Sequence, residues 1–243
     1  MTKSMTYPRR GLHGEVVHTI GLQIVSGELQ PGDPLPPEDE LTADLAVSRT
    51  VLREAVRVLA AKGLVQARPK TGTRVRPRSE WNIVDPDVLS WRAEASEDHE
   101  LYTEVTEVRL AIEPFAARLA ATRATEEEVA GIAEAYAAME AGVSDQAAYL
   151  AADLLFHHRI LVASHNELLG HVGDVLRVVL RQTFQFTTTF NTSRRRALPL
   201  HRAILDGIAA HDEEAAEQAT RTLIADTAAN IRRAEPKRRR KRH

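Results

Sequence analysis

The pattern of apolar and polar residues predicts a chain that is mostly α-helical. Apolar residues spaced four apart mark a first helix over about residues 10–26, which should end near Gly27. A short second helix begins with an acidic first turn, residues 38–40, and carries Leu41 and Leu45 on its buried side. Ser48 stands at the N-cap position of a third helix, whose apolar stripe ends before Gly63.

Two short β-strands should follow this third helix. Residues 64–68 and 73–76 are typical of strands, and the turn residues Pro69-Lys70-Thr71-Gly72 lie between them. Three helices followed by a hairpin within about 70 residues is the plan of a winged helix-turn-helix. We therefore expect this domain over residues 1–77.

Beyond residue 77 every strong pattern is helical. We expect a linker and connecting helix over residues 78–96 and a bundle of six or seven helices over residues 97–233. Residues 234–243 include six consecutive basic residues, whose mutual repulsion predicts a disordered tail. The predicted fold class is mainly α, with an N-terminal winged helix-turn-helix and a C-terminal all-α helical bundle.

The charges are segregated along the chain, although the net charge is only -2. The net charge is +3 over residues 1–80, -12 over residues 81–231 and +7 over residues 232–243. Residues 45–78 hold nine basic residues and one acidic residue, which favours a polyanionic partner for this part of the chain. The acidic middle is not expected to bind nucleic acid.

Composition excludes several other classes of protein. The chain has no cysteine, so disulfides, thiolate metal sites and cysteine nucleophiles are ruled out. No stretch approaches the roughly 18 apolar residues of a membrane span, and Arg9 and Arg10 do not precede a signal-peptide hydrophobic region. We expect a cytoplasmic protein with no membrane partner.

One face of the predicted third helix is lined by basic residues that are suited to contacting DNA. Arg49, Arg53 and Arg57 are four apart and share the face opposite the apolar stripe, with Thr50 beside Arg49 at the helix N-terminus. In a helix-turn-helix this end of the second helix reaches base edges, and guanidinium groups bind guanine or phosphate. A solvated basic face is the alternative, but it leaves the basic hairpin unexplained.

Four runs of residues carry a resemblance to a known family. They are LPPEDEL at 35–41, VSRTVLREA at 47–55, KGLV at 62–65 and TGTRV at 71–75. Together they resemble the DNA-binding domain of GntR-family regulators. The resemblance implies that Arg49, Thr50 and Arg53 touch operator DNA. Some members carry a basic DNA contact where this chain has Asp39, so that contact is not carried over. The residues expected at the DNA are Ser48, Arg49, Thr50, Arg53, Arg57, Lys70, Thr71, Gly72 and Arg74.

Residues 100–230 are similar to the all-helical ligand domain of the FadR subfamily, called FCD. The matching residues are Glu107-Val108-Arg109, Glu113-Pro114, Asp153, Phe156-His157, Ser164-His165-Asn166, His201, Ile204 and Ile208. In many relatives one Asp and three His hold a divalent metal that helps to bind a carboxylate effector. The resemblance implies Asp153, His157 and His201 as ligands of a metal such as zinc. The position of the last family histidine is Leu223, which cannot be a ligand.

Other arrangements of the same residues remain open. Asp153 and His157 can pair with each other while His201 binds the effector directly, and His158 and His165 are expected as surface or capping residues. Arg109 can either bind an effector carboxylate with its planar fork or form an ion pair with Glu113. The expected effector-binding residues are Arg109, Asp153, His157, Asn166 and His201.

A narrower likeness concerns the effector. Residues 78–91 resemble the linker of galactonate-responsive repressors in this subfamily, which also lack the last histidine. This likeness favours a sugar acid, an aldonate. The chain departs from those repressors at Leu155, where they carry an arginine.

The sequence therefore predicts a ligand-responsive repressor that binds a palindromic operator as a homodimer and is not an enzyme. The alternatives are a regulator that responds to another small carboxylate through a bound metal, a metal-dependent helical-bundle enzyme and a nonspecific DNA-packaging protein. No zincin pattern or phosphate-binding loop supports an enzyme.

Overall fold

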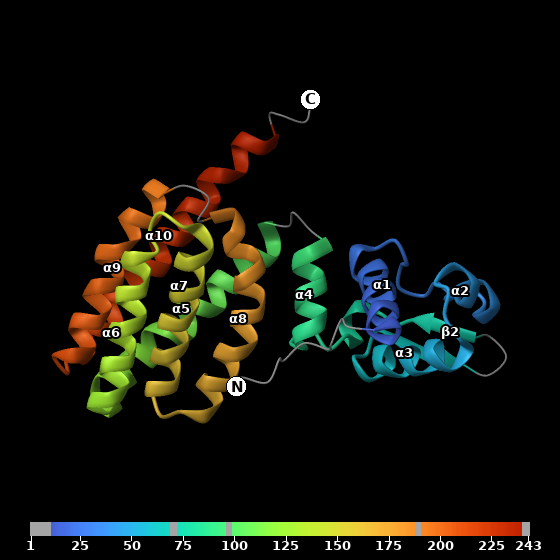
Figure 1. Cartoon of the computed structure of the whole chain (residues 1–243), viewed down its shortest axis with the longest axis horizontal. Coiled ribbons are helices and arrows are strands. Elements are labelled where there is room, and N and C mark those ends of the chain that lie inside the picture. The colour runs from blue at the N-terminus through green and yellow to red at the C-terminus, as the bar shows by residue number, and fades with distance from the viewer. Residues whose placement is uncertain (1–10, 69–71, 96–98, 188–190, 240–243) are drawn as a thin grey trace. The chain divides into compact units, whose positions relative to one another are not determined.

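The computed structural model describes residues 11–68, 72–95, 99–187 and 191–239 of the chain (Figure 1). The chain divides into two compact units, Met1–Glu97 and Asp98–His243. Within the described residues there are ten α-helices and one two-stranded sheet, so the predicted fold class is confirmed. None of the helices in the described ranges is both long and apolar enough to span a membrane.

The N-terminal unit has the expected order of elements. Its elements are α1 (Leu12–Ser26), α2 (Glu38–Asp44), α3 (Arg49–Ala61), β1 (Val65–Arg68), β2 (Gly72–Val75), the 3-10 helix η1 (Arg78–Glu80) and α4 (Pro86–Ala95). The two strands pair antiparallel, with Val65 opposite Val75 and Arg68 opposite Gly72. The helix boundaries lie within a few residues of the predicted ones.

The segment before α2 pairs with strand β2 of the hairpin. Pro34 forms a bridge with Arg74, and the amide of Leu35 donates to the carbonyl of Thr73 over 2.8 Å. The amide of Val75 donates to the carbonyl of Asp33 over 2.9 Å. Residues 33–35 thus form a third short extended segment, whose backbone hydrogen bonds pair it with the edge strand β2. The sequence of this loop, with its Pro and Gly residues, did not predict the segment.

Helix α4 is part of the core of the N-terminal unit. Trp81, Val88 and Trp91 lie in the same buried cluster as the apolar faces of α1 and α3. The indole N–H of Trp91 donates to Nδ1 of His18 over 2.9 Å. A Cβ atom at Gly21 would lie 2.6 Å from the Trp91 ring, so only glycine lets α1 approach the indole this closely. The segment predicted as linker and connecting helix therefore packs against the winged helix-turn-helix.

A part-buried ionic cluster joins the end of α3 to the start of α4. Nζ of Lys62, the C-cap of α3, lies 3.0 Å from Oδ1 of Asp85 and 2.6 Å from Oδ2 of Asp87. Burial disfavours the charge on Lys62, but the bonds to Asp87 and Asp85 outweigh it and raise the pKa of the ammonium. Gly63 next to it has a φ of +76°, and a Cβ there would lie 2.5 Å from the Glu80 carbonyl oxygen. The C-terminal end of α3 is thus fixed against residues 80–87.

The C-terminal unit is a bundle of six helices within the described residues. They are α5 (His99–Arg123), α6 (Glu126–Ala141), α7 (Gln146–Ala163), α8 (Glu167–Thr187), α9 (Asn191–Ala209) and α10 (Glu213–Arg239). Thr125 and Glu128 form a capping box at the start of α6, and Asp145 caps α7. Phe156 on α7 lies at the centre of the core, in one cluster with Ile204 and Ile208 of α9 and Leu223 of α10.

Helix α10 is longer than the sequence predicted. It continues to Arg239, whereas the pattern placed its end near residue 233 and a disordered tail over residues 234–243. The predicted disorder of the tail stays a prediction, and residues 240–243 lie outside the described residues. The stretch 234–239 combines the strong helix formers alanine, glutamate, lysine and arginine with Pro236, which ordinarily disfavours the interior of a helix.

Candidate DNA-binding surface and effector site

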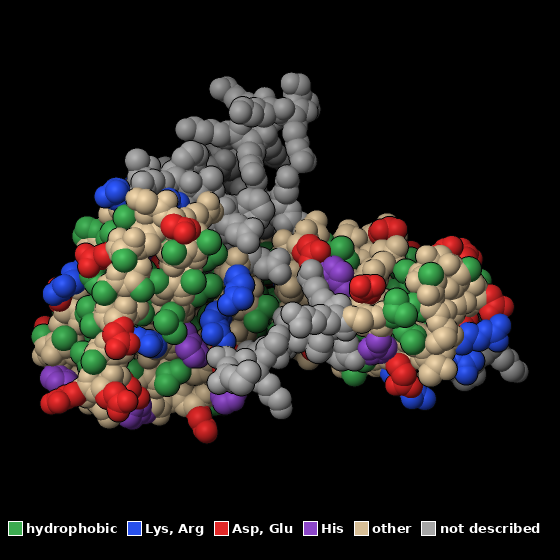
Figure 2. All heavy atoms as spheres, viewed as in Figure 1, with side chains coloured by type: hydrophobic (Ala, Val, Ile, Leu, Met, Phe, Trp, Pro, Cys, Tyr) green, Lys and Arg blue, Asp and Glu red, His purple; other side chains and the backbone are tan. Residues whose placement is uncertain are grey.

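The N-terminal half of α3 presents arginines to solvent. Ser48 has extended backbone dihedrals and its hydroxyl accepts the amide of Val51 over 3.3 Å, so it is the predicted N-cap. The side chains of Arg49, Arg53 and Arg57 are 65%, 66% and 76% exposed, and Thr50 is exposed beside them. Figure 2 shows blue basic side chains gathered next to red acidic ones at the end of the N-terminal unit that carries α2. The geometry agrees with a helix whose outer face is available to DNA.

Each of the three arginines has an acidic partner. Arg49 donates to Asp39 over 2.7 Å, and Arg53 donates to both oxygens of Glu38 over 2.9 and 3.3 Å. Arg57 pairs with Glu54, one turn earlier on the same helix. The sequence placed the acidic residues at the N-terminus of α2 but did not show that they face α3.

The hairpin residues predicted to contact DNA, Lys70, Thr71, Gly72 and Arg74, are called the wing residues, and they divide into three groups. Arg74 donates to the carbonyl of Gly32 over 2.8 Å, so its guanidinium ties the hairpin to the preceding loop. Gly72 begins β2 with a φ of +78° and is exposed. Lys70 and Thr71 lie outside the described residues. The structure thus gives Arg74 a structural hydrogen bond, while its predicted DNA contact stays a prediction.

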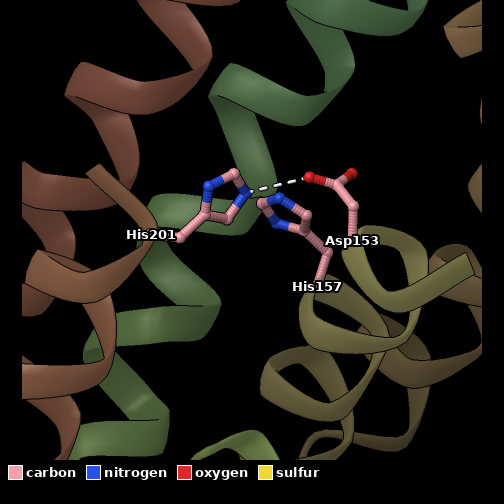
Figure 3. Close-up of side chains that lie close together, drawn as sticks. All are labelled: Asp153, His157 and His201. Carbon is pink, nitrogen blue, oxygen red and sulfur yellow. Dashed lines mark ion pairs between the residues drawn. The ribbon is translucent and has the colours of Figure 1, made fainter. Parts of the chain in front are cut away.

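The second site lies inside the helical bundle. Asp153 and His157 are one turn apart on α7, and His201 projects from α9 toward them (Figure 3). All three are buried, and one potential ligand atom from each lies within 4.8 Å of the others. The sequence therefore predicted a group of side chains that the fold does bring together.

The hydrogen bonds of the two histidines determine where their lone pairs lie. Nδ1 of His157 lies 2.9 Å from Oε2 of Glu113, and Nδ1 of His201 lies 2.9 Å from the carbonyl oxygen of Ala197. Because both partners only accept hydrogen bonds, each Nδ1 carries the proton, and each Nε2 of a neutral imidazole keeps its lone pair. This is the arrangement of metal-binding histidines, which donate their other ring N–H to a carboxylate or carbonyl.

The acceptors at the centre of the cluster lack donors. Nε2 of His201 lies 3.0 Å from Oδ1 of Asp153 but makes no hydrogen bond of good geometry with any described residue. Oδ2 of Asp153 is also buried without a hydrogen-bond partner among the described residues. A carboxylate and an imidazole lone pair at this distance require a proton or a cation between them.

Arg109 and Glu113 complete the cluster from α5. Nε and Nη2 of Arg109 lie 2.6 and 3.2 Å from the two oxygens of Glu113, and Nη2 lies 3.4 Å from Nε2 of His157. Arg109 is only 2% exposed, so the expectation that its head group points into the bundle is confirmed. The ion pair with Glu113 is present. The sequence missed Glu113 as a site residue, although its position four residues after Arg109 was the signal for it.

The surroundings keep both buried carboxyl groups ionised. Burial alone would raise the pKa of Glu113, but Arg109 and His157 outweigh burial and lower that pKa to about 2. Burial also opposes the charge on Asp153, yet His201, His157 and Arg109 lower the pKa of this carboxyl below its usual value. The site is therefore a buried cluster of charged groups enclosed by an apolar bundle.

The remaining predicted residues lie elsewhere. Oδ1 of Asn166 accepts the amides of Leu168 and Leu169 over 3.1 and 3.3 Å and so caps α8. Asn166 lines a separate cavity of about 520 Å³ between α7 and α8, together with His158 and His165. The ring of His165 pairs with Glu128 over 2.9 Å. The group of potential ligands found among the described residues consists of Asp153, His157 and His201. Leu223 is buried in the bundle core.

Comparison with known proteins identifies the two units. Residues 12–75 match the model of the bacterial regulatory proteins of the gntR family, and residues 104–226 match the FCD domain. The chain belongs to the GntR family. It carries the FCD domain of that family as its effector domain, and it is a DNA-binding, ligand-responsive transcriptional regulator rather than an enzyme.

Several curated relatives cover nearly the whole chain. The galactonate operon transcriptional repressor of Escherichia coli is 38% identical over 89% of this chain and 95% of its own length. A probable D-xylose utilization operon transcriptional repressor of Paenarthrobacter nicotinovorans is 32% identical over 87% of this chain and 84% of its own length. A solved structure of Lar, which controls expression of the Listeria monocytogenes agr system, is similar with a TM-score of 0.66. It is 19% identical over 93% of this chain and 99% of its own, so this likeness shows the fold.

Proposed function

We propose that this GntR-family protein is a repressor of sugar-acid catabolism genes that leaves its operator when an aldonate binds the FCD domain. The observation that carries the proposal is the buried cluster of Arg109, Asp153, His157 and His201, in a chain 38% identical to a galactonate operon repressor. A cationic guanidinium and imidazole nitrogens recognise a carboxylate, and buried polar groups can bind the hydroxyls of a sugar acid.

The same residues fit a divalent metal such as zinc. The Nε2 lone pair of His201 and the unpartnered Oδ2 of Asp153 lie in one buried place with the ring of His157, whose Nε2 is 3.4 Å from Nη2 of Arg109. Together these three side chains are the donor set of an open two-histidine, one-carboxylate site. Asp153, His157 and His201 would hold the ion, and the bound ion would supply positive charge for the effector carboxylate. Leu223 leaves the site one imidazole short of the family pattern, so its metal affinity is expected to be lower.

A second candidate is a different small carboxylate in the same site. It is favoured because the likeness to galactonate-responsive repressors in residues 78–91 lies outside the FCD match at residues 104–226. The departure from those repressors at Leu155, where they carry an arginine, does not by itself favour either acid. Leu155 is 38% exposed on α7, and Asp153, two residues before it, is buried. The substitution therefore lies away from the buried cluster, and the likeness of residues 78–91 alone does not distinguish aldonates from other hydroxy acids.

We assign the recognition of operator bases to the exposed N-terminal end of α3. Arg49, Thr50 and Arg53 are proposed to reach base edges, and Arg57 and the wing to contact phosphates. Two copies joined as a homodimer would place two such helices on a palindromic operator. An effector that binds one arrangement of the dimer better than the other shifts the population toward it, and operator affinity falls by the ratio of the effector affinities.

The test is fluorescence anisotropy of the full-length protein on labelled DNA from upstream of its own gene and neighbouring genes. Nonspecific competitor DNA is present, and aldonates and small hydroxy or dicarboxylic acids are added one at a time. Release by one aldonate supports the whole proposal. Specific binding that is released only by another acid replaces the aldonate with the second candidate, and binding without sequence preference contradicts the regulator mechanism.

A further inference from the structure

Two of the arginines proposed to reach DNA are held by carboxylates from another helix. Asp39 binds Nη2 of Arg49 over 2.7 Å, and Glu38 binds Arg53 through two hydrogen bonds. These pairs join residues ten and fifteen positions apart, across the turn between α2 and α3. By contrast, the partner of Arg57 lies on the same helix, where such pairs are common.

The pair between Asp39 and Arg49 is too exposed to contribute much to stability. The two side chains are 79% and 65% exposed, and solvent screens an ion pair of this kind. Its effect is expected instead on the conformation of Arg49. A long side chain that samples many rotamers is restrained by the pair, so less conformational entropy is lost when it binds a base.

The charge of Asp39 also disfavours the binding of DNA phosphates to this surface. In a helix-turn-helix the first helix crosses the DNA backbone, and a helix N-terminus ordinarily attracts phosphate. Here the first turn of α2 consists of Glu38, Asp39 and Glu40, which repel phosphate. An Arg49 held by Asp39 must break the ion pair to bind the backbone, whereas its other N–H groups can still reach a base edge.

We propose that Asp39 is a specificity-determining residue of this regulator. It acts through Arg49, which it holds in the orientation that reads one base pair in each half-site, and its charge weakens binding to nonspecific DNA. The inference rests on the proposed contact between Arg49 and a base. Asp39 itself is a positioning residue.

The experiment compares full-length Asp39→Asn with Glu40→Gln. Glu40 lies in the same turn of α2 and is also exposed, so the control removes one charge without removing the bond to Arg49. Each protein selects sites from a random duplex library, and anisotropy then gives affinities for the selected site, its single base-pair variants and nonspecific DNA. Both variants should bind nonspecific DNA more tightly than wild type. Only Asp39→Asn should lose discrimination at one base pair per half-site, by about 2-fold to 5-fold, because an exposed ion pair restrains Arg49 only weakly.

The outcomes separate this inference from the proposed DNA contact. If Asp39→Asn selects the wild-type motif with unchanged discrimination, Asp39 is only a surface charge and the inference is wrong. Arg49→Ala is measured in parallel, and unchanged discrimination in that variant would reject the proposed base contact and with it the inference. Thermal unfolding followed by tryptophan fluorescence confirms that each variant is folded, because both tryptophans, Trp81 and Trp91, lie in the core of this unit.

Discussion

His157 and Glu113 meet in the interior of the bundle, with Nδ1 of the imidazole 2.9 Å from Oε2 of the carboxylate. This contact joins α7 to α5 and fixes the orientation of a ring whose other nitrogen faces Asp153 and His201. Glu113 therefore supports the site without belonging to the predicted ligand set.

The first prediction concerns this support. Glu113→Gln should weaken zinc binding by about 10-fold to 100-fold, because the amide is a poorer partner for the imidazole N–H than a carboxylate is. The dissociation constant is measured at neutral pH by competition with a coloured chelator. Glu107→Gln, an exposed residue on the same helix, is the matched control. A wild-type protein that competes with no chelator would contradict the metal assignment itself.

Arg109 allows a test of carboxylate binding. Arg109→Lys keeps a buried positive charge but removes the planar fork that spans two oxygens, so release from DNA should need at least about 10-fold more sugar acid. Operator affinity without effector should not change. Arg118→Lys is the control, because Arg118 also lies on α5 but is exposed and paired with Glu213. A wild-type dose response in Arg109→Lys would leave Arg109 with a purely structural ion pair.

Arg53 offers a direct test of the proposed DNA contacts of α3. Arg53→Ala should cost about 1–3 kcal/mol of operator binding and relax the base preference. Anisotropy on the selected site and on its single base-pair variants measures both effects. Arg118→Ala, in the other unit, should bind as wild type does. Full affinity with unchanged preference in Arg53→Ala would mean that another surface reads the operator.

Lys62 should be necessary for the stability of the N-terminal unit. Lys62→Met removes the cation from a part-buried cluster in which Asp85 still accepts the amides of Asp87 and Val88, so the free energy of unfolding should fall by about 1–3 kcal/mol. Urea unfolding followed by tryptophan fluorescence reports this unit alone, since both tryptophans lie in it. Arg57→Met, which removes an exposed pair, should change the free energy of unfolding by no more than about 0.5 kcal/mol. Equal stabilities of the two variants would show that the part-buried cluster adds nothing.

Asn166 was expected at the effector, but its amide oxygen caps α8. Asn166→Ala should therefore lower the free energy of unfolding by about 1 kcal/mol, whereas Asn166→Asp, which also caps well, should preserve it. Circular dichroism in urea measures the change, because the loss falls in the helical bundle. An unchanged stability combined with a lost response to sugar acids would return Asn166 to the effector site.

The parts of the fold that depend on neighbouring residues could be predicted from the sequence. The stripe on α3 and its cap at Ser48 are local patterns, and so is the spacing that places Asp153 and His157 on one face of α7. The position of His201 next to them came from the family resemblance, because no local pattern brings α9 beside α7.

Contacts between segments far apart in the sequence could not be predicted from such local patterns. The bond of Asp39 to Arg49 depends on the angle between α2 and α3, and the bond of Lys62 to Asp87 joins residues 25 positions apart. In the sequence, Asp39 indicated only a favourable interaction with the helix dipole, and Asp87 indicated only a polar residue of the linker. Arg74 similarly suggested a DNA contact, since nothing in the pattern placed the Gly32 carbonyl beside it.

The attachment of α4 to α1 and α3 sets the boundary for exchanging domains between regulators. A hybrid that takes its DNA-binding part from this chain only as far as the wing would lose Trp81, Val88 and Trp91 from the core and leave Lys62 without its carboxylates. A fusion point after Ala95 keeps these contacts together. The transferable module is therefore the first 95 residues, and a new operator specificity can be supplied to another effector domain only with α4 included.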